Sequence, residues 1–227
     1  MREDIKRLLL HLIAPTRCPV CGDFIRPDER FCPECEAELT VWNGEHTIPG
    51  ADSFTAAYEY NDAVKPAVML LKNGIADNAD YALGGALHDR LKENGVIESA
   101  DVILPVPMTA EDVSERGFNQ AVLICRRIGK LSGLPVSECL EKQTETLPQK
   151  TLTKAQREVN LRGAFRVTDT AAVKDRRVLL VDDVCTTGST LAELTKLLRE
   201  CGAKEVHCAA CCKTPSAGSD DKYPDNG

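Results

Sequence analysis

The stretch "VLLVDDVCTTGSTL", Val178–Leu191, decides which fold and which chemistry we expect of this 227-residue chain. A run of apolar residues leads into two adjacent carboxylates, Asp182 and Asp183. A turn rich in Thr, Gly and Ser then precedes a segment with helical spacing. In α/β proteins with a parallel sheet, ligands bind beside the carboxyl ends of the strands. We therefore expect the two acids and the turn to form a binding site at the end of a strand.

The turn after the acids has the composition of an anion-binding site. Backbone N–H groups converge at the N-terminus of a helix, where the helix dipole also favours negative charge. Hydroxyl groups add donors, a glycine permits close approach of the backbone, and the turn contains no lysine. The two acids suit sugar hydroxyls or Mg²⁺. The pattern predicts a sugar-phosphate site whose turn residues are Thr186, Thr187, Gly188, Ser189 and Thr190.

Two other interpretations of this stretch fit less well. A strand followed by an ordinary N-capped helix also favours Asp and Ser, but one capping residue would be enough. Most residues between Asp182 and Thr190 are polar or glycine, which exceeds that need. A receiver domain also has an acidic pair at a strand end. It begins with that pair, however, whereas here the pair lies near residue 182 of 227.

Strands and helices alternate from about residue 100 onward, which predicts an α/β fold with a mainly parallel sheet flanked by helices. The strands are continuously apolar, as expected for strands buried on both faces. We expect strands at 54–61, 101–107, 176–181 and 205–212, and helices at 62–74, 79–95, 116–135 and 189–202. The Gly84–Gly85 pair either weakens its helix or marks close helix packing. The buried face expected of helix 116–135 consists of Phe118, Ala121, Cys125, Ile128 and Leu131.

The N-terminal stretch "CPVCGDFIRPDERFCPEC" has the spacing of a metal site, with two CxxC pairs separated by ten residues. Four thiolates from two such turns can complete a tetrahedron around Zn²⁺ and leave no open position, so the zinc would be structural. A module this small cannot bury enough apolar surface to fold alone, and metal binding would supply the missing free energy. The alternatives are a redox CxxC or plain structural thiols. The expected zinc ligands are Cys18, Cys21, Cys32 and Cys35.

Composition narrows the class of protein further. The net charge of −7 makes the chain a poor non-specific DNA binder, because phosphate contacts need clustered Lys and Arg. An odd total of 11 cysteines argues against a disulfide framework and for a reducing, cytoplasmic location. We interpret Leu8–Pro15 as a short amphipathic helix, not as a signal peptide. The expected organisation is a zinc ribbon at 1–45, an α/β domain at 50–213 and a disordered tail at 214–227.

The turn is also similar to the fingerprint of the type I phosphoribosyltransferases, and the whole chain resembles the competence protein F (ComF) family. The resemblance covers Leu9 to Lys213 and follows five elements in order: the four-cysteine ribbon, "LLKNG", "ILPVPM", "ERGFNQA", and "LTKAQREVNLRGAFRV" with the opening stretch. The segment "LLKNGIADNAD" departs from the family pattern after its lysine, so we assign no ligand role to Lys72.

The resemblance implies a role for each part of the site. Asp182 and Asp183 would be the catalytic acids that hold the ribose hydroxyls of phosphoribosyl pyrophosphate, which binds with Mg²⁺. Residues 186–190 would hold its 5′-phosphate. The loop after "ILPVP" would be the pyrophosphate loop and leads to Arg116, although an ordinary capped helix start explains that segment too. Residues 150–166 would form a flexible hood with Lys154 and Arg157 as ligands, or else a solvated loop.

The resemblance leaves two classes of function open. The first is an enzyme, a phosphoribosyltransferase (a glycosyltransferase) with an unknown acceptor. The second is a non-catalytic accessory factor in competence and DNA uptake that binds single-stranded DNA or helicase-type partners. In that case the zinc ribbon would be the docking surface. The intact acids and turn favour retained binding of phosphoribosyl pyrophosphate, and the acidic balance argues against tight DNA binding by this chain alone.

Overall fold

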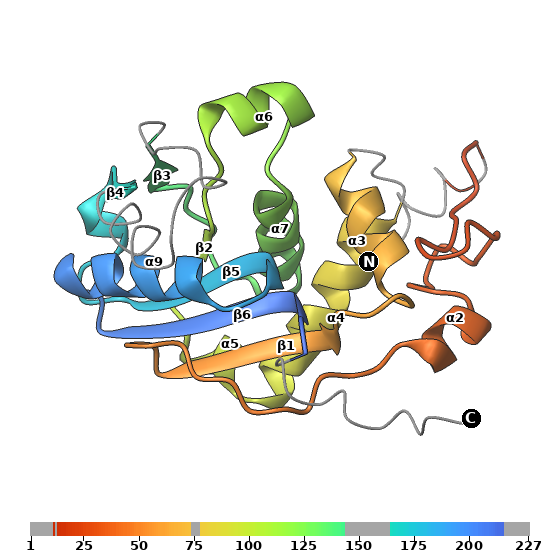
Figure 1. Ribbon diagram of the computed structural model, residues 1–227, viewed down its shortest axis with the longest axis horizontal. Helices are drawn as coiled ribbons and strands as arrows, with labels where there is room; N and C mark the ends of the chain where they lie inside the picture. The colour runs from red at the N-terminus through yellow and green to blue at the C-terminus, as the bar shows by residue number, and fades with distance from the viewer. Residues whose placement is uncertain (1–10, 12, 74–77, 144–163, 216–227) are drawn as a thin grey trace, which may run out of the picture.

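The computed structural model describes residues 11, 13–73, 78–143 and 164–215. Its main sheet has four strands in the order β1-β6-β5-β2, and all neighbouring strands are parallel (Figure 1). The prediction of a mainly parallel sheet flanked by helices is confirmed. The strands are β1 (Ser53–Glu59), β2 (Val102–Pro105), β5 (Arg177–Cys185) and β6 (Glu205–Lys213).

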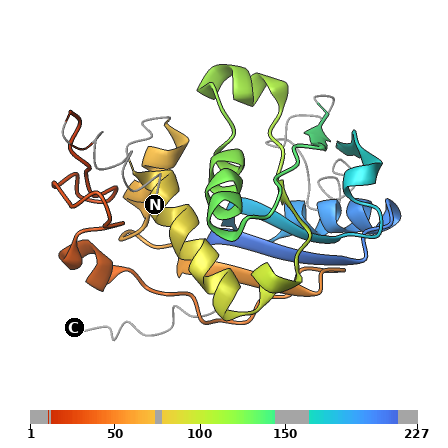
Figure 2. The same ribbon diagram turned by 180° about the vertical axis from the view of Figure 1, so that it is seen from behind.

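Helices cover both faces of the sheet, as the views from opposite sides show (Figures 1 and 2). The helices α4 (Ala79–Glu93) and α7 (Gln120–Ser132) pack on one face, and α9 (Ser189–Glu200) packs on the other. The neighbouring residues Leu179 and Leu180 of β5 are buried on opposite faces of the sheet. Leu179 belongs to the core under α4 and α7, and Leu180 belongs to the core under α9. This alternation between two buried faces explains why the strand sequences are apolar throughout.

Shorter elements surround this three-layer body. These shorter elements are α2 (Pro33–Glu38), α3 (Lys65–Lys72), α5 (Val96–Ser99), α6 (Ala110–Arg116), β3 (Leu140–Lys142), β4 (Phe165–Val167) and the 3₁₀ turn η2 (Thr170–Ala172). Of these, β3 and β4 form a separate antiparallel pair. Helix α6 was not among the helices expected from the sequence, although its signals are present there. The Thr109 side chain accepts a hydrogen bond from the backbone N–H of Asp112, and Gly117 ends the helix with a φ of 83°.

Strand β5 is longer than predicted. We expected it to end before the acids, at residue 181, but it continues to Cys185. Its pairing with β2 ends where Pro105 meets Val181, whereas its pairing with β6 extends to Cys185 opposite Lys213. The acids therefore lie on a part of β5 that has a neighbour on one side only.

The expected buried face of α7 was wrong at its two ends. Ala121, Cys125 and Ile128 are buried as predicted, but Leu131 is 40% exposed. Phe118 precedes the helix, because Asn119 is its N-cap. A residue advances the helix by about 100°, which puts Leu131 about 80° from the middle of the buried stripe. Ile124 takes the inward position instead and is fully buried.

The paired glycines of α4 mark close packing on two sides. A Cβ on Gly84 would lie 3.0 Å from the Cβ of Arg127 in α7. A Cβ on Gly85 would lie 2.8 Å from the Nε of Arg30, which belongs to the cysteine-rich segment. Arg30 also forms a 2.8 Å ion pair with Asp89 of α4. The glycines thus let α4 touch both α7 and the N-terminal module.

Some predictions concern parts of the chain that the structure does not describe. Half of the expected helix at Leu8–Pro15 (residues 8–10 and 12) and the tail from residue 216 lie outside the described residues. Among the helices that the structure does describe, none has both the length and the apolar character needed to span a bilayer.

Replacing Gly84 with Leu should force α4 away from α7. The new side chain has no room beside Arg127, and overpacking of this kind costs about 1–3 kcal/mol of the free energy of unfolding. Thermal and urea unfolding would measure the loss. Lys92→Leu, at an exposed position of the same helix, is the matched control. Equal stability of the two variants would contradict the close packing described here.

Candidate functional site

The two acids of β5 lie past the end of β2, at the carboxyl edge of the sheet. Each carboxylate accepts a hydrogen bond from the next backbone N–H: Asp182 Oδ1 from Asp183 at 2.8 Å, and Asp183 Oδ1 from Val184 at 2.7 Å. Burial, together with the neighbouring charge of Asp183, raises the pKa of Asp182 to about 8. A pair of adjacent carboxylates in this setting favours a cation or hydroxyl donors close by.

Lys72 joins this edge from α3. Its Nζ lies 3.4 Å from Asp183 Oδ2, and both side chains are largely buried, at 33% and 17% exposure. Lys72 was expected to have no ligand role, because the residues after it depart from the family pattern. The structure nevertheless brings it to the acids. Against the larger effects of burial and of the Asp183 charge, the charge of Lys72 also acts to lower the pKa of Asp182.

Asp182 shares a small pocket with the turn that follows it, residues 186–190, which we call the TTGST turn. Asp182, Thr186, Gly188, Ser189 and Thr190 all line this pocket, together with Val184, Cys185 and Leu191. Within the turn, the Thr187 hydroxyl donates to Ser189 Oγ at 3.2 Å, and the Ser189 N–H donates to Thr187 Oγ1 at 3.4 Å. The predicted convergence of an acid and the turn is therefore observed.

Gly188 is the N-cap of α9, and its position has no room for a side chain. Its φ is 79°, a left-handed conformation that favours glycine. A Cβ there would clash with Ile48 and lie 3.1 Å from the Nε2 of His46. Ile48 and His46 belong to the segment between α2 and β1, so a stretch far away in sequence forms the back of the TTGST turn. Nothing in the local sequence pattern predicted this contact.

A buried lysine from β6 also reaches the turn. Lys213 is 4% exposed, and its Nζ donates to the carbonyl oxygens of Thr186 at 2.9 Å and Thr214 at 2.7 Å. The turn itself contains no lysine, as expected, and Lys213 reaches it from the neighbouring strand β6. Its signal in the sequence is a charged residue at the end of the apolar strand "EVHCAACCK".

Among the described residues, Arg116 is a predicted site residue that does not line this pocket. Arg116 is exposed at the end of α6, which rises away from the sheet at the top of Figure 1. Asn119, three residues further on, makes hydrogen bonds within the fold. Its Nδ2 donates to the Val106 carbonyl at 2.9 Å, and its Oδ1 accepts from the Ala121 N–H. Lys154 and Arg157 lie outside the described residues. Arg166, from the end of the predicted hood, donates to Glu141 at 2.8 Å.

Two parts of this chain match known protein domains. Residues 93–227 match the phosphoribosyl transferase domain, and residues 9–46 match a double zinc ribbon domain. The chain is 36% identical over 213 residues to competence protein F of Haemophilus influenzae, covering 87% of this chain and 90% of that protein. This chain belongs to the ComF/YhgH family.

Further members of the ComF/YhgH family match over a similar length. The DNA utilization protein YhgH of Escherichia coli is 30% identical over 208 residues, with coverage of 87% and 90%. Competence protein ComFC of Bacillus subtilis is 27% identical over 206 residues, with coverage of 88% and 77%. Among solved structures, a glutamine phosphoribosylpyrophosphate amidotransferase from B. subtilis matches with a TM-score of 0.42 and 24% identity. That match covers 59% of this ComF-family chain and 26% of the amidotransferase.

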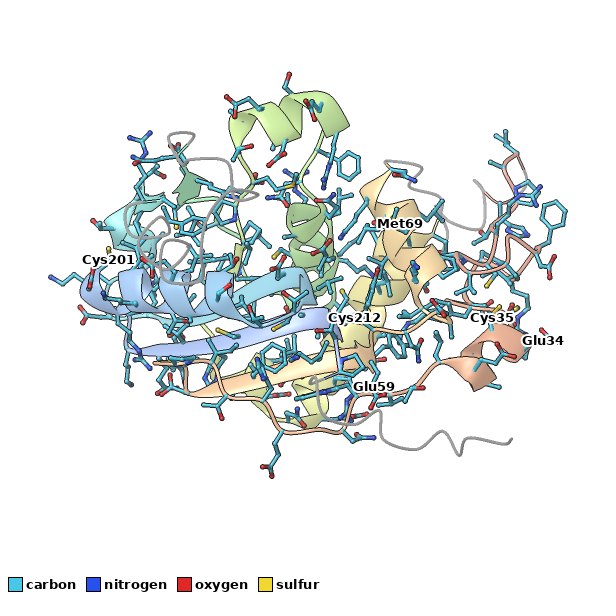
Figure 3. All side chains as sticks on the ribbon, in the orientation of Figure 1. Glu34, Cys35, Glu59, Met69, Cys201 and Cys212 are labelled. Carbon is cyan, nitrogen blue, oxygen red and sulfur yellow. The ribbon has the colours of Figure 1, made fainter. Side chains whose placement is uncertain are left out.

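The four cysteines of this ComF-family chain form one cluster. Their sulfur atoms all lie within 4.8 Å of one another, and the Sγ atoms of Cys21 and Cys32 are 3.7 Å apart. A tetrahedron with Zn–S bonds of about 2.3 Å has edges of about 3.8 Å, so the spacing fits zinc. Cys32 also caps α2. Figure 3 shows Cys35 in this ribbon, apart from Cys212 in the last part of β6. The cluster supports a structural zinc ion.

Elemental analysis of the purified protein should find one zinc ion per chain. Cys18→Ser should remove most of the zinc and lower the melting temperature, because binding of the metal contributes folding free energy to so small a module. Cys201→Ser, at a half-buried cysteine outside the cluster, is the matched control and should keep its zinc. Full zinc content in Cys18→Ser would contradict the four-cysteine site.

Proposed function

We propose that this ComF/YhgH-family protein binds phosphoribosyl pyrophosphate together with Mg²⁺, as a phosphoribosyltransferase whose acceptor is unknown. The observation that carries the proposal is the shared pocket of Asp182 and the TTGST turn at the carboxyl edge of the sheet. A carboxylate suited to sugar hydroxyls thus lies beside a helix N-terminus suited to a phosphate. The match to the phosphoribosyl transferase domain supports the same assignment.

Each group has a role that its chemistry suits. The backbone N–H groups and hydroxyls of the TTGST turn donate to the 5′-phosphate of the ligand. Asp182 and Asp183 accept hydrogen bonds from the ribose hydroxyls, and Lys72 keeps Asp183 in place through their ion pair. Holding the sugar at both ends fixes the anomeric carbon between them, which lowers the entropic cost of the reaction with an acceptor.

The residues at this edge also fit Mg²⁺. Hard cations prefer oxygen ligands, and two adjacent carboxylates offer them. Burial and the neighbouring charge of Asp183 raise the pKa of Asp182, and a bound divalent cation would oppose both effects by favouring the ionised form. When bound, Mg²⁺ neutralises charge on the pyrophosphate group. Asp182 and Asp183 are the described residues that would hold it.

The division into modules is part of the proposal. We infer a ribbon at residues 1–45 and a ligand-binding domain at 50–213. The ribbon contains the four-cysteine cluster, and the second unit contains the sheet, the acids and the TTGST turn. The short stretch between them includes His46 and Ile48, which contact Gly188.

Replacing Asp182 and Asp183 together with Asn should reduce the affinity for phosphoribosyl pyrophosphate in Mg²⁺ by a factor of about 100 or more, since hydrogen bonds to charged groups contribute about 1.5–3 kcal/mol each. Isothermal titration calorimetry measures the loss. Thermal stability should change little, because relief of the repulsion between the two carboxylates offsets the loss of the ion pair between Asp183 and Lys72. Asp62→Asn, at a fully exposed carboxylate, is the control. Unchanged affinity in the double variant would refute the site.

A second candidate function rests on the ribbon and on the names of the relatives, which concern competence and DNA utilization. Phe24 is 63% exposed there, and the guanidinium of Arg17 lies 4.1 Å from the centre of its ring. An exposed aromatic ring beside a cation is a suitable stacking surface for single-stranded DNA. The protein would then be an accessory factor that binds DNA or a helicase-type partner.

Fluorescence anisotropy with a labelled oligonucleotide separates the two candidates. If the ribbon binds single-stranded DNA, Phe24→Ala should weaken binding about tenfold, since stacking contributes about 1–3 kcal/mol per base. Met69→Ala, at an exposed apolar residue of α3, should not. A parallel screen of nucleobases and amines for pyrophosphate release tests catalysis. Absence of DNA binding at low salt would rule out the accessory role for this chain alone.

A further inference from the structure

A buried lysine lies next to the TTGST turn without a described counter-charge. Lys213 is 4% exposed at the end of β6. In the register of the sheet it pairs with Cys185 on one side and with Glu59 of β1 on the other. Among the residues that the structure describes, no carboxylate oxygen lies within ion-pair distance of its Nζ. Burial of a charge is costly unless the charge is paired.

The hydrogen bonds of Lys213 solvate its charge without neutralising it. Its ammonium group has three N–H donors. Two of them reach the carbonyl oxygens of Thr186 and Thr214, and within the described part of the chain no acceptor is assigned to the third. The Thr186 bond ties the ammonium directly to the first residue of the TTGST turn. The backbone N–H of Thr214 also donates to the Cys185 carbonyl, so the end of β6 holds the start of the turn at two points.

The charge of Lys213 acts on both sides of the turn. Lys213 lies opposite Cys185 in the sheet and donates a hydrogen bond to the Thr186 carbonyl. Both Cys185 and Thr186 line the pocket shared with Asp182. On the other side, burial and then the charge of Lys213 lower the pKa of His46. Lys213 thus brings a positive charge next to both the turn and His46.

We propose that Lys213 makes the TTGST turn selective for a dianionic phosphate, by holding the Thr186 carbonyl and by supplying the buried positive charge that the bound anion neutralises. Because this charge is shielded from water, its attraction for an anion is screened much less than that of a surface lysine. Lys213 is thus a positioning residue for the phosphate end of the ligand. The inference rests on the proposed function and names how that site selects its ligand.

The first test is affinity for ribose 5-phosphate, a ligand that occupies only the sugar and phosphate parts of the site. Lys213→Met should weaken binding about tenfold or more, as expected when a hydrogen-bonded charge is lost. Lys213→Arg, which keeps the charge, should bind within about threefold of the original protein. Lys196→Met is the matched control, because Lys196 is an exposed lysine of α9, and it should bind normally. Equal affinity of Lys213→Met and the original protein would overturn the proposal.

The second test separates the charge from a merely structural bond to Thr186. The phosphate group of a monoester has a second pKa of about 6, and a nearby positive charge lowers it. A ³¹P NMR titration of bound ribose 5-phosphate should give a phosphate pKa well below that of the free ligand, and Lys213→Met should remove much of the difference. The titratable groups facing this region are Asp182, His46, Cys185 and Glu59, and variants of each would check that none of them causes the shift.

The outcomes distinguish the two proposals. If the original protein binds neither ribose 5-phosphate nor phosphoribosyl pyrophosphate, the proposed function fails. If it binds them but the bound phosphate keeps the pKa of the free ligand, only the role of Lys213 fails. This last measurement uses the unaltered protein, so the proposal stays testable even if Lys213→Met does not fold.

Discussion

The unequal pairing of β5 with its two neighbours is the constraint on which the candidate site depends. β2 stops at Pro105, opposite Val181, whereas β6 accompanies β5 as far as Cys185. Val106 and Pro107 then carry the chain away from the sheet toward α6. Asp182 and Asp183 therefore lie on a strand that is fixed on one side and open on the other. A rigid strand holds the acids on one side, and the edge of the sheet is open on the other.

This arrangement explains why a strand, and not a loop, presents the acids. β6 continues to hydrogen-bond β5 beside them, and Lys213 and Thr214 extend that support to the first residue of the TTGST turn. Gly188 then starts α9 against Ile48 and His46. The turn is consequently held from two directions by segments that are distant in sequence. Such support keeps N–H donors in place before a ligand arrives, and that preorganisation increases affinity.

The sequence alone predicted the features that follow from local pattern. Periodicity and apolar runs located the strands and the main helices, and the four cysteines and the TTGST turn carried recognisable spacing. What could not be predicted depends on contacts between distant residues. The true end of β5 depends on where β2 stops, and the approach of Lys213 depends on strand order. No periodic pattern in the sequence indicates that Ile48 and His46 lie behind Gly188. The helix α6 is different, because its capping residues Thr109 and Gly117 are visible in the sequence. It was missed because it is too short to show a clear helical period.

The segment that leads from the ribbon to β1 has a consequence for how this protein can be divided. Ile48 is 2% exposed and fills the space behind Gly188, so it belongs physically to the sheet and not to the ribbon that precedes it. Trp42, earlier in the same segment, already donates to the Ala57 carbonyl of β1. A shortened chain that lacks the ribbon would therefore have to retain residues from about Trp42 onward. One that starts at β1 would leave a hole against the helix N-terminus and expose apolar atoms of α9 to water.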